Sequence, residues 1–169
     1  LSNTNNLRTT VANNLNYSSN NFISKLGFQN NFDLYFKNLN AVGKNDSIYT
    51  SDTQIDGMSI LKIDSSFPLI RSKNTIKETL TPKVSLRINP GNNMSNYSGT
   101  LRNINANNVY DINRLGLSND FEAGRSITLG LDYKFDHLEN NQSEDTKDKY
   151  LEFKLATVFR DQNENNIPT

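Results

Sequence analysis

The sequence predicts an all-β fold in which consecutive strands pair as an antiparallel up-and-down meander. Apolar side chains recur at every second residue, which is the spacing of a strand with two different faces. The clearest run, residues 126–135, alternates without interruption, and residues 151–160 alternate with one weak position at Thr157. Helical spacing is scarce, and no stretch approaches the roughly 18 consecutive apolar residues that a membrane-spanning helix needs.

The composition narrows the class of protein further. The 169 residues carry 18 Lys and Arg against 18 Asp and Glu, and this zero net charge disfavours a general nucleic-acid binder. Only 34% of the residues are hydrophobic and the mean hydropathy is -0.68, yet 9 Phe and 7 Tyr disfavour intrinsic disorder. With no Cys and one His, the chain offers neither thiolate nor multi-His metal sites. We expect His137 at a solvated strand end or turn.

Six strands are predicted, in chain order, at residues 7–17, 22–36, 61–69, 80–88, 126–135 and 151–160. The second run is either one long strand or two strands that meet around Asn30 and Asn31. In the fourth run, Pro82 is expected near the strand start, where its missing N–H falls before the hydrogen-bonded ladder begins. The intervening connections, residues 18–21, 38–54, 71–79, 90–120 and 137–147, alternate in length. Such alternation gathers the longer loops at one end, as in outer-membrane barrels.

The run lengths predict where the two faces lie. A membrane strand needs about 9–11 tilted residues, and the clearest runs approach that length, whereas strands of globular proteins usually have about 5–6. We therefore expect a fragment of a large transmembrane outer-membrane β-barrel. The residues expected to face lipid are Phe28, Leu34, Val84, Leu86, Ile88, Ile127, Leu129, Leu131, Leu151, Phe153 and Leu155. Those expected to face a wet lumen are Lys25, Asp33, Lys37, Lys83, Arg87, Asp132, Lys134, Glu152, Lys154 and Arg160.

Aromatic residues gather at or near the predicted strand ends, where an interfacial girdle of a membrane barrel would place them. They are Tyr17, Phe22, Phe36, Phe67, Tyr133, Phe135, Tyr150 and Phe159. A soluble β-sandwich, serving as a binding or adhesin module, has the same alternation with its apolar face in a packed core, and it stays open as an alternative.

Several segments are similar, in order, to one family. Residues 80–90 read LTPKVSLRINP and precede a long Asn-rich loop. Residues 112–116, INRLG, and residues 121–125, FEAGR, then lead into the Gly-containing strand that begins at Ser126. Upstream, residues 65–69 read SSFPL, and FRDQ at residues 159–162 adds a weaker match. This ordered set resembles the C-terminal barrel of the LptD family of lipopolysaccharide-assembly outer-membrane proteins, of the α-proteobacterial type. Its motif residues here are Pro82, Asn113, Arg114, Gly116, Glu122, Gly124 and Arg125.

The resemblance implies a translocon of the Gram-negative outer membrane, with no bond chemistry. Members of the family receive lipopolysaccharide from a periplasmic Lpt bridge through an N-terminal jellyroll domain and release it into the outer leaflet through a lateral opening. In many bacteria an LptE-like lipoprotein plugs the barrel. The chain lacks the cysteines that form disulfides in enteric members. A generic porin-like barrel shares the architecture and stays open as a second alternative.

The remaining expectations concern organisation and chemistry. The chain starts at Leu1 without an initiator Met or a leader sequence, so we expect residues 1–169 to be one partial barrel domain within a longer chain, with no second domain. Motifs of nucleotide binding and of serine hydrolysis are missing, and we predict no enzyme activity, cofactor or metal site. Residues 90–120 are expected either to fold into the lumen as a constriction or to remain a surface loop.

Overall fold

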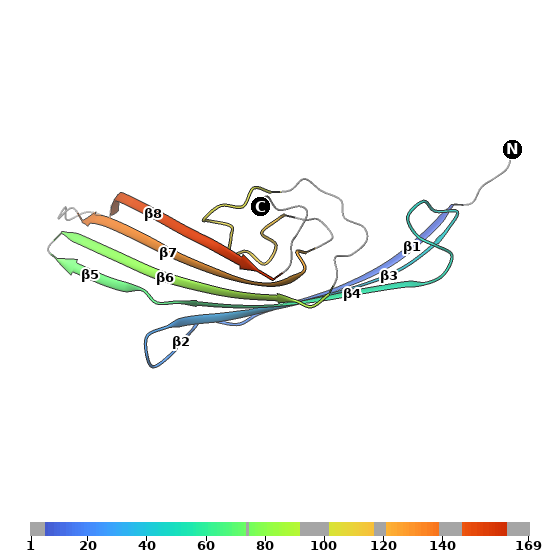
Figure 1. Ribbon diagram of the computed structural model, residues 1–169, viewed down its shortest axis with the longest axis horizontal. Coiled ribbons are helices and arrows are strands. Elements are labelled where there is room, and N and C mark those ends of the chain that lie inside the picture. Colours follow the sequence, from blue (N-terminus) through green and yellow to red (C-terminus); the bar gives the residue numbers. More distant parts are fainter. Residues whose placement is uncertain (1–5, 74, 92–101, 117–120, 139–146, 162–169) are drawn as a thin grey trace.

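Residues 6–73, 75–91, 102–116, 121–138 and 147–161 are described by a computed structural model of the chain. They form an antiparallel β-sheet, without a helix among them. The strands are β1 (Leu7–Ser18), β2 (Phe22–Ile23), β3 (Gln29–Lys44), β4 (Gln54–Ser66), β5 (Leu69–Lys73), β6 (Ile76–Asn89), β7 (Gly124–Leu138) and β8 (Lys147–Arg160). Figure 1 shows a long, curved sheet. The predicted all-β, antiparallel class is confirmed.

The sheet follows the predicted meander. Its strand order is β1-β3-β4-β6-β7-β8, and each strand is antiparallel to its neighbours. The short strand β2 pairs with β3 beyond the end of β1, and β5 pairs with β6 beyond the end of β4. The sheet therefore has six strand positions. It is open, with β1 and β8 at its two edges (Figure 1).

The strands are longer than the hydrophobic pattern predicts. β3 has 16 residues and β7 has 15. Residues 38–44, expected in a long connection, continue β3, where Lys44 pairs with Leu7 of β1 and Ala41 pairs with Gln54 of β4. Backbone pairing with β1 and with β4 extends β3 through polar residues. A pattern of alternating hydrophobic residues does not detect such an extension. The connection between β3 and β4 is therefore residues 45–53 only.

The β2–β3 connection corrects the second predicted run. The chain turns at residues 24–28, not around Asn30 and Asn31. Gly27 has a φ of 89°, which favours glycine, and its N–H donates to the carbonyl of Ser24 at 2.9 Å. The Ser24 hydroxyl also accepts the N–H of Phe28 at 3.1 Å. Lys25 consequently lies in an exposed turn and not on the polar face of a strand, and Phe28 lies just before β3.

Pro82 is a second correction, because it pairs with Leu131 in the interior of β6 and not near its start. The Pro82 carbonyl accepts the N–H of Phe67 at 3.0 Å, in the break between β4 and β5. In an antiparallel ladder the N–H and C=O of one residue point to the same neighbouring strand. The missing N–H of Pro82 therefore falls at this break, where the ladder is already interrupted.

Loop residues 102–116 and 121–123 cover one face of the sheet, which we call the inner face; the opposite face is the outer face. In Figure 1 this loop lies on the concave side of the sheet. Side chains of β4 and of the loop form a small apolar core there, in which Met58, Ile60 and Phe121 are buried against Tyr35, Leu39 and Ile112. This core holds the described part of the loop against the inner face of the sheet.

Candidate functional site: an apolar outer face and a polar inner face

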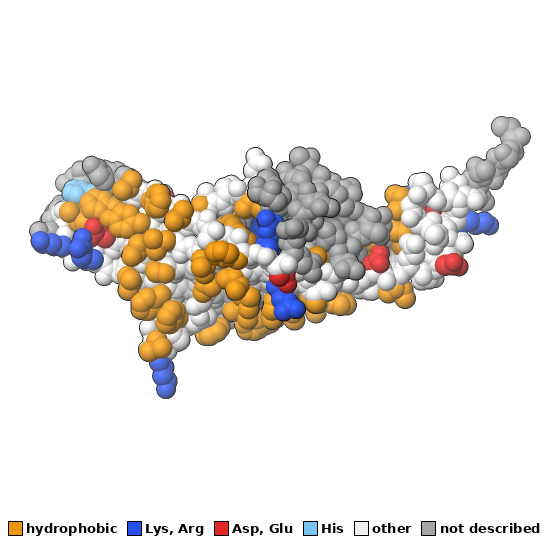
Figure 2. Space-filling model, in the orientation of Figure 1, with side chains coloured by type: hydrophobic (Ala, Val, Ile, Leu, Met, Phe, Trp, Pro, Cys, Tyr) orange, Lys and Arg blue, Asp and Glu red, His pale blue; other side chains and the backbone are white. Residues whose placement is uncertain are grey.

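The outer face is apolar and exposed across all six strand positions. Cross-strand pairs continue it from strand to strand: Leu34 with Leu61, Ile63 with Leu86, and Val84 with Leu129. It includes Leu15, Phe32, Phe36, Ile127, Leu151, Phe153 and Phe159, all at least 38% exposed. Figure 2 shows hydrophobic side chains gathered along the convex underside of the sheet and towards the end that carries β5.

The inner face is polar, and much of it is buried. On β6 the buried residues are Ser85, Arg87 and Asn89, and on β7 they include Ser126 and Thr128. Thr128 is 3% exposed, whereas its neighbours Ile127 and Leu129 on the outer face are 45% and 44% exposed. Polarity and burial therefore coincide on these strands, which is the reverse of a soluble sheet with an apolar core.

Ion pairs neutralise the charges of the inner face. Lys62 of β4 contacts Asp64 at 2.5 Å and Asp33 of β3 at 3.5 Å. Further along the sheet, Lys83 pairs with Asp132, Lys134 with Asp136 at 3.0 Å, and Lys154 with Glu152 at 2.9 Å. Charges that leave water are tolerated when they are paired and hydrogen-bonded. The basic and acidic side chains of this face thus pair locally, and these pairs leave no large region of a single charge.

A buried network fixes the loop to β7. The guanidinium of Arg114 binds both oxygens of Glu122, with Nε 2.6 Å from Oε2, and both side chains are at most 3% exposed. Nη2 of Arg114 also donates to the Ser126 hydroxyl at 3.2 Å, and Nη1 lies 3.5 Å from the Thr128 hydroxyl. The Arg160 guanidinium of β8 lies 3.9 Å from Oε1 of Glu122. A bidentate pair in this surrounding positions the loop more tightly than an exposed pair can.

Asn89 completes the attachment at the end of β6. It is fully buried, and its Nδ2 donates to the backbone carbonyl of Glu122 at 3.0 Å. Its Oδ1 accepts the N–H of Gly91 at 3.2 Å, where the chain leaves the strand. Asn89 therefore links the two ends of the long β6–β7 connection.

Tyr110 places a second part of the loop over the sheet. Its hydroxyl lies against Gly130 of β7, so close that a Cβ at Gly130 would come within 1.6 Å of the oxygen. The Lys83 ammonium lies 5.6 Å from the centre of the ring, and Lys154 donates to Asn107 at 2.9 Å. Burial raises the pKa of the Tyr110 phenol above its ordinary value, and the nearby carboxylate of Asp132 adds to this.

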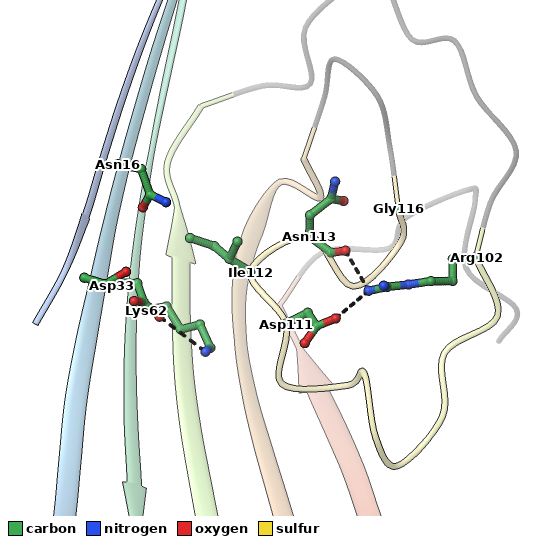
Figure 3. A pocket seen from close by; sticks show the side chains of 9 residues that line it. Asn16, Asp33, Lys62, Arg102, Asp111, Ile112, Asn113 and Gly116 are labelled. Atoms are coloured by element: carbon green, nitrogen blue, oxygen red, sulfur yellow. Dashed lines mark hydrogen bonds and ion pairs between the residues drawn. The ribbon is translucent and has the colours of Figure 1, made fainter. Parts of the chain in front are cut away.

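A cavity of about 520 Å³ lies between the loop and the strands β1, β3 and β4 (Figure 3). Its charged residues are paired: Lys62 with Asp33, and Arg102 with Asp111 at 2.7 Å. Arg102 also donates to the carbonyl of Asn113 at 3.0 Å. The cavity falls in the size range of small-molecule sites, about 300–1,000 Å³. Two basic and two acidic groups leave it without net charge, which suits a neutral polar ligand.

At the far end of the sheet, the β3–β4 connection is tied to β1. The carboxylate of Asp46 accepts two hydrogen bonds from Arg8, at 2.8 and 3.2 Å, and two from the N–H groups of Ile48 and Tyr49. The Arg8 contact, followed by the backbone donors, lowers the pKa of Asp46 to about 2. This pair holds the connection of residues 45–53 against β1.

The alternation of side chains along the predicted strands assigned residues to two opposite faces, and nearly all of these residues share a face with the other members of their set. On the inner face lie Asp33, Lys37, Lys83, Arg87, Asp132, Lys134, Glu152, Lys154 and Arg160. On the outer face lie Leu34, Val84, Leu86, Ile88, Ile127, Leu129, Leu131, Leu151, Phe153 and Leu155. Lys25 and Phe28 are outside the strands, and Phe28 stacks on Phe67 at 4.8 Å between ring centres.

The motif residues have separate positions. Arg114 and Glu122 meet in the buried network. Gly116, in the loop, has a φ of 71°, and Gly124, the first residue of β7, has a φ of 82°. Arg125 is exposed beside Asp161. His137 is exposed at the end of β7, near the Thr75 hydroxyl, as expected. The side chain of Tyr150 and residues 92–101 and 117–120 of the predicted loop lie outside the described residues.

Comparisons with models of protein families, with curated proteins and with solved structures found no match. Within the part of the chain that the structure describes, no cluster of His, Cys, Asp and Glu is suited to hold a metal ion. The same residues contain no helix of the length and apolarity that crossing a membrane requires.

Proposed function

We propose that the chain is a section of a large outer-membrane β-barrel whose outer face contacts lipid and whose inner face lines the lumen. The observation that carries this proposal is the exposed apolar outer face, which continues in register over six strand positions. Monomeric soluble proteins rarely expose contiguous apolar patches of more than a few hundred Å². A bilayer removes the cost of this exposure, and flanking strands would pair with the open edges at β1 and β8.

The barrel is proposed to belong to a lipopolysaccharide translocon of the LptD type. The ordered resemblance supports this choice over a generic porin-like barrel, and so does the polar cavity without net charge, whose Asn, Asp and Arg side chains suit sugar hydroxyls. The proposed partners are lipopolysaccharide, an LptE-like plug, and the periplasmic Lpt bridge, which would act through an N-terminal jellyroll outside this chain. The reaction is transport, without bond chemistry.

The membrane placement is tested by a matched pair of arginine substitutions on β3. Leu34 is on the outer face and 41% exposed, whereas Asn31 is on the inner face, opposite Asp64. Arginine at the centre of a lipid-facing strand costs about 2–4 kcal/mol, so Leu34→Arg is expected to reduce outer-membrane assembly of the full-length protein strongly. Asn31→Arg should assemble normally. Equal assembly of the two variants would rule out lipid contact at this face.

The translocon assignment needs a separate experiment. Depletion of the protein that contains this chain, in the bacterium that encodes it, should reduce lipopolysaccharide at the cell surface and accumulate it in the inner membrane. A coding sequence with an upstream jellyroll domain should accompany this result. Unchanged surface lipopolysaccharide after depletion would leave the generic barrel as the better assignment, provided that the Leu34→Arg result supports a barrel.

A further inference from the structure

A groove on the outer face crosses the boundary between the apolar side chains and the charged strand ends. It has a volume of about 320 Å³ and is lined by Leu69, Ile70, Arg71, Glu78, Leu80 and Tyr133. The three strands β5, β6 and β7 meet here, since Leu69 pairs with Leu80 and Leu80 with Tyr133. The boundary runs through the groove itself, because the next outer-face pair towards the strand ends is Arg71 with Glu78.

The polar half of the groove is arranged around the carboxylate of Glu78. Nε of Arg71 donates to Oε2 of Glu78, and the Tyr133 hydroxyl donates to Oε1 at 3.1 Å. Both carboxylate oxygens are thus occupied, and the Glu78 side chain is only 19% exposed. Arg71 is 78% exposed, and within the described residues its two Nη groups make no hydrogen bond. One edge of the guanidinium is therefore held by Glu78 while the opposite edge is open to a ligand.

The charge and shape of the groove favour an anion with an apolar tail. On the outer face of β5, Arg71 and Lys73 are both exposed. Glu78 lies opposite Arg71 and Ile76 lies opposite Lys73, which leaves one net positive charge among these side chains. The forked guanidinium matches the oxygens of a phosphate group. Below it, Leu69 and Leu80 continue into the apolar surface of Val84 and Leu131. Figure 2 shows basic side chains beside hydrophobic ones at this end of the molecule.

We propose that this groove binds an anionic phospholipid, with the headgroup phosphate on Arg71 and an acyl chain along Leu69 and Leu80. The inference rests on the proposed placement of the outer face in a bilayer. The groove lies at the end of the sheet where residues 74–75 connect β5 to β6, opposite the long β6–β7 connection. In bacterial outer-membrane barrels the short turns face the periplasm, so the site would meet the periplasmic leaflet.

The test uses the full-length protein, purified in detergent and titrated with phosphatidylglycerol or phosphatidylcholine while native mass spectrometry counts bound lipids. Arg71→Gln should weaken phosphatidylglycerol binding about tenfold, because it removes a charge-assisted hydrogen bond, and tenfold in affinity corresponds to about 1.4 kcal/mol. Arg71→Lys keeps the positive charge but loses the forked guanidinium. Its affinity for phosphatidylglycerol should lie between those of the unchanged protein and of Arg71→Gln. Lys25→Gln is the matched control, because it removes an exposed charge from the β2–β3 turn and should leave binding unchanged.

Three results would overturn the site: equal effects of Arg71→Gln and Lys25→Gln, equal affinity for the two lipids, or displacement of phosphatidylglycerol by millimolar inorganic phosphate. Circular dichroism should show that all variants fold, which the exposure of Arg71 favours. If Leu34→Arg blocks assembly while Arg71→Gln has no effect on lipid binding, the headgroup site fails and the barrel assignment stands. If Leu34→Arg assembles normally, the barrel assignment fails first.

Discussion

Thr128 and Leu129 are consecutive residues of β7, yet the hydroxyl-bearing side chain is 3% exposed and the leucine is 44% exposed. The same inversion recurs on β6, where Ser85 is buried and Val84 is exposed. The difference shows that polarity alone does not decide burial in this sheet. Burial follows the loop, which brings polar partners to the inner face, while the outer face receives no cover from the described residues.

The two faces also differ in how they are stabilised. The inner face depends on specific contacts, such as the pair of Arg114 and Glu122, and a change in one partner leaves the other unsatisfied. The outer face has few directional contacts, so its side chains are interchangeable as long as they stay apolar. Substitutions on the inner face should therefore destabilise the fold, whereas on the outer face only a change of polarity should matter.

The largest effect is expected at the buried ion pair. Arg114→Met removes the bidentate partner of the buried Glu122 carboxylate and leaves only Arg160, 3.9 Å away; breaking a buried pair in this way typically costs about 3–5 kcal/mol. Urea denaturation of the full-length protein in detergent, followed by circular dichroism, measures the loss. Glu122→Gln should be destabilising for the same reason, since it leaves the guanidinium without a counter-charge.

The double variant Arg114→Met with Glu122→Leu sharpens this test. Removing both charges at once avoids a lone buried charge, so the double variant should be more stable than Arg114→Met alone. Additive losses would mean that the two side chains do not act as a pair and that the loop is attached by other contacts.

A smaller effect is expected from Gly130→Ala. The new Cβ would overlap the Tyr110 hydroxyl and approach the carbonyl of Leu155 to 3.0 Å, and such overpacking costs about 1–3 kcal/mol. Hydrogen exchange should accelerate in residues 102–116 as Tyr110 is displaced. Gly57→Ala is the control, because its Cβ would meet only the Lys37 carbonyl at 3.9 Å. Tyr110→Phe should partly rescue Gly130→Ala; faster exchange in both glycine variants would argue against the Tyr110 contact.

The smallest effect concerns pH and the partly buried Asp46. Its pKa of about 2 lies below the ordinary value of 3.8, so its ionised form favours the folded connection. This contribution is complete above about pH 4 and is lost as the pH falls towards 2. NMR titration of the Asp46 carboxyl should show the low pKa, and Arg8→Gln should raise it. Arg125→Gln, which removes an arginine beside Asp161, should not; an equal shift in both variants would contradict the local pair.

The sequence predicted the faces better than the ends of the strands. Two-residue spacing assigned Ile127 and Thr128 to opposite faces correctly, because side-chain direction in a strand depends only on parity. The same spacing placed Lys25 on a strand wrongly. The turn built on Ser24 and Gly27 hardly interrupts the alternation of apolar and polar residues, so the sequence pattern does not reveal it. Strand ends were missed where polar residues continue the ladder, as at Asn38.

The loop attachment was the part that sequence reasoning did not find. Arg114 and Glu122 stood among the motif residues, but a separation of eight residues in a loop carries no periodic signal. Asn89 was hidden for another reason, since a buried Asn is rare and its partner here is a backbone carbonyl. Both contacts depend on how the loop returns over the sheet, which is a tertiary property.

The most direct test of the two-face account is a cysteine scan along β7 in the full-length protein reconstituted in lipid bilayers. Residues 1–169 contain no Cys, so spin labels can be attached one at a time at residues 127, 128, 129, 131 and 132 after substitution, for example Ile127→Cys, once any Cys elsewhere in the full-length protein has been replaced. Position 130 is left out, because a side chain there would displace Tyr110. Labels at 127, 129 and 131 should collide preferentially with molecular oxygen, which concentrates in lipid. Labels at 128 and 132 should not. Equal oxygen accessibility at both parities, or preferential collision of the odd positions with a water-soluble nickel complex, would contradict the account.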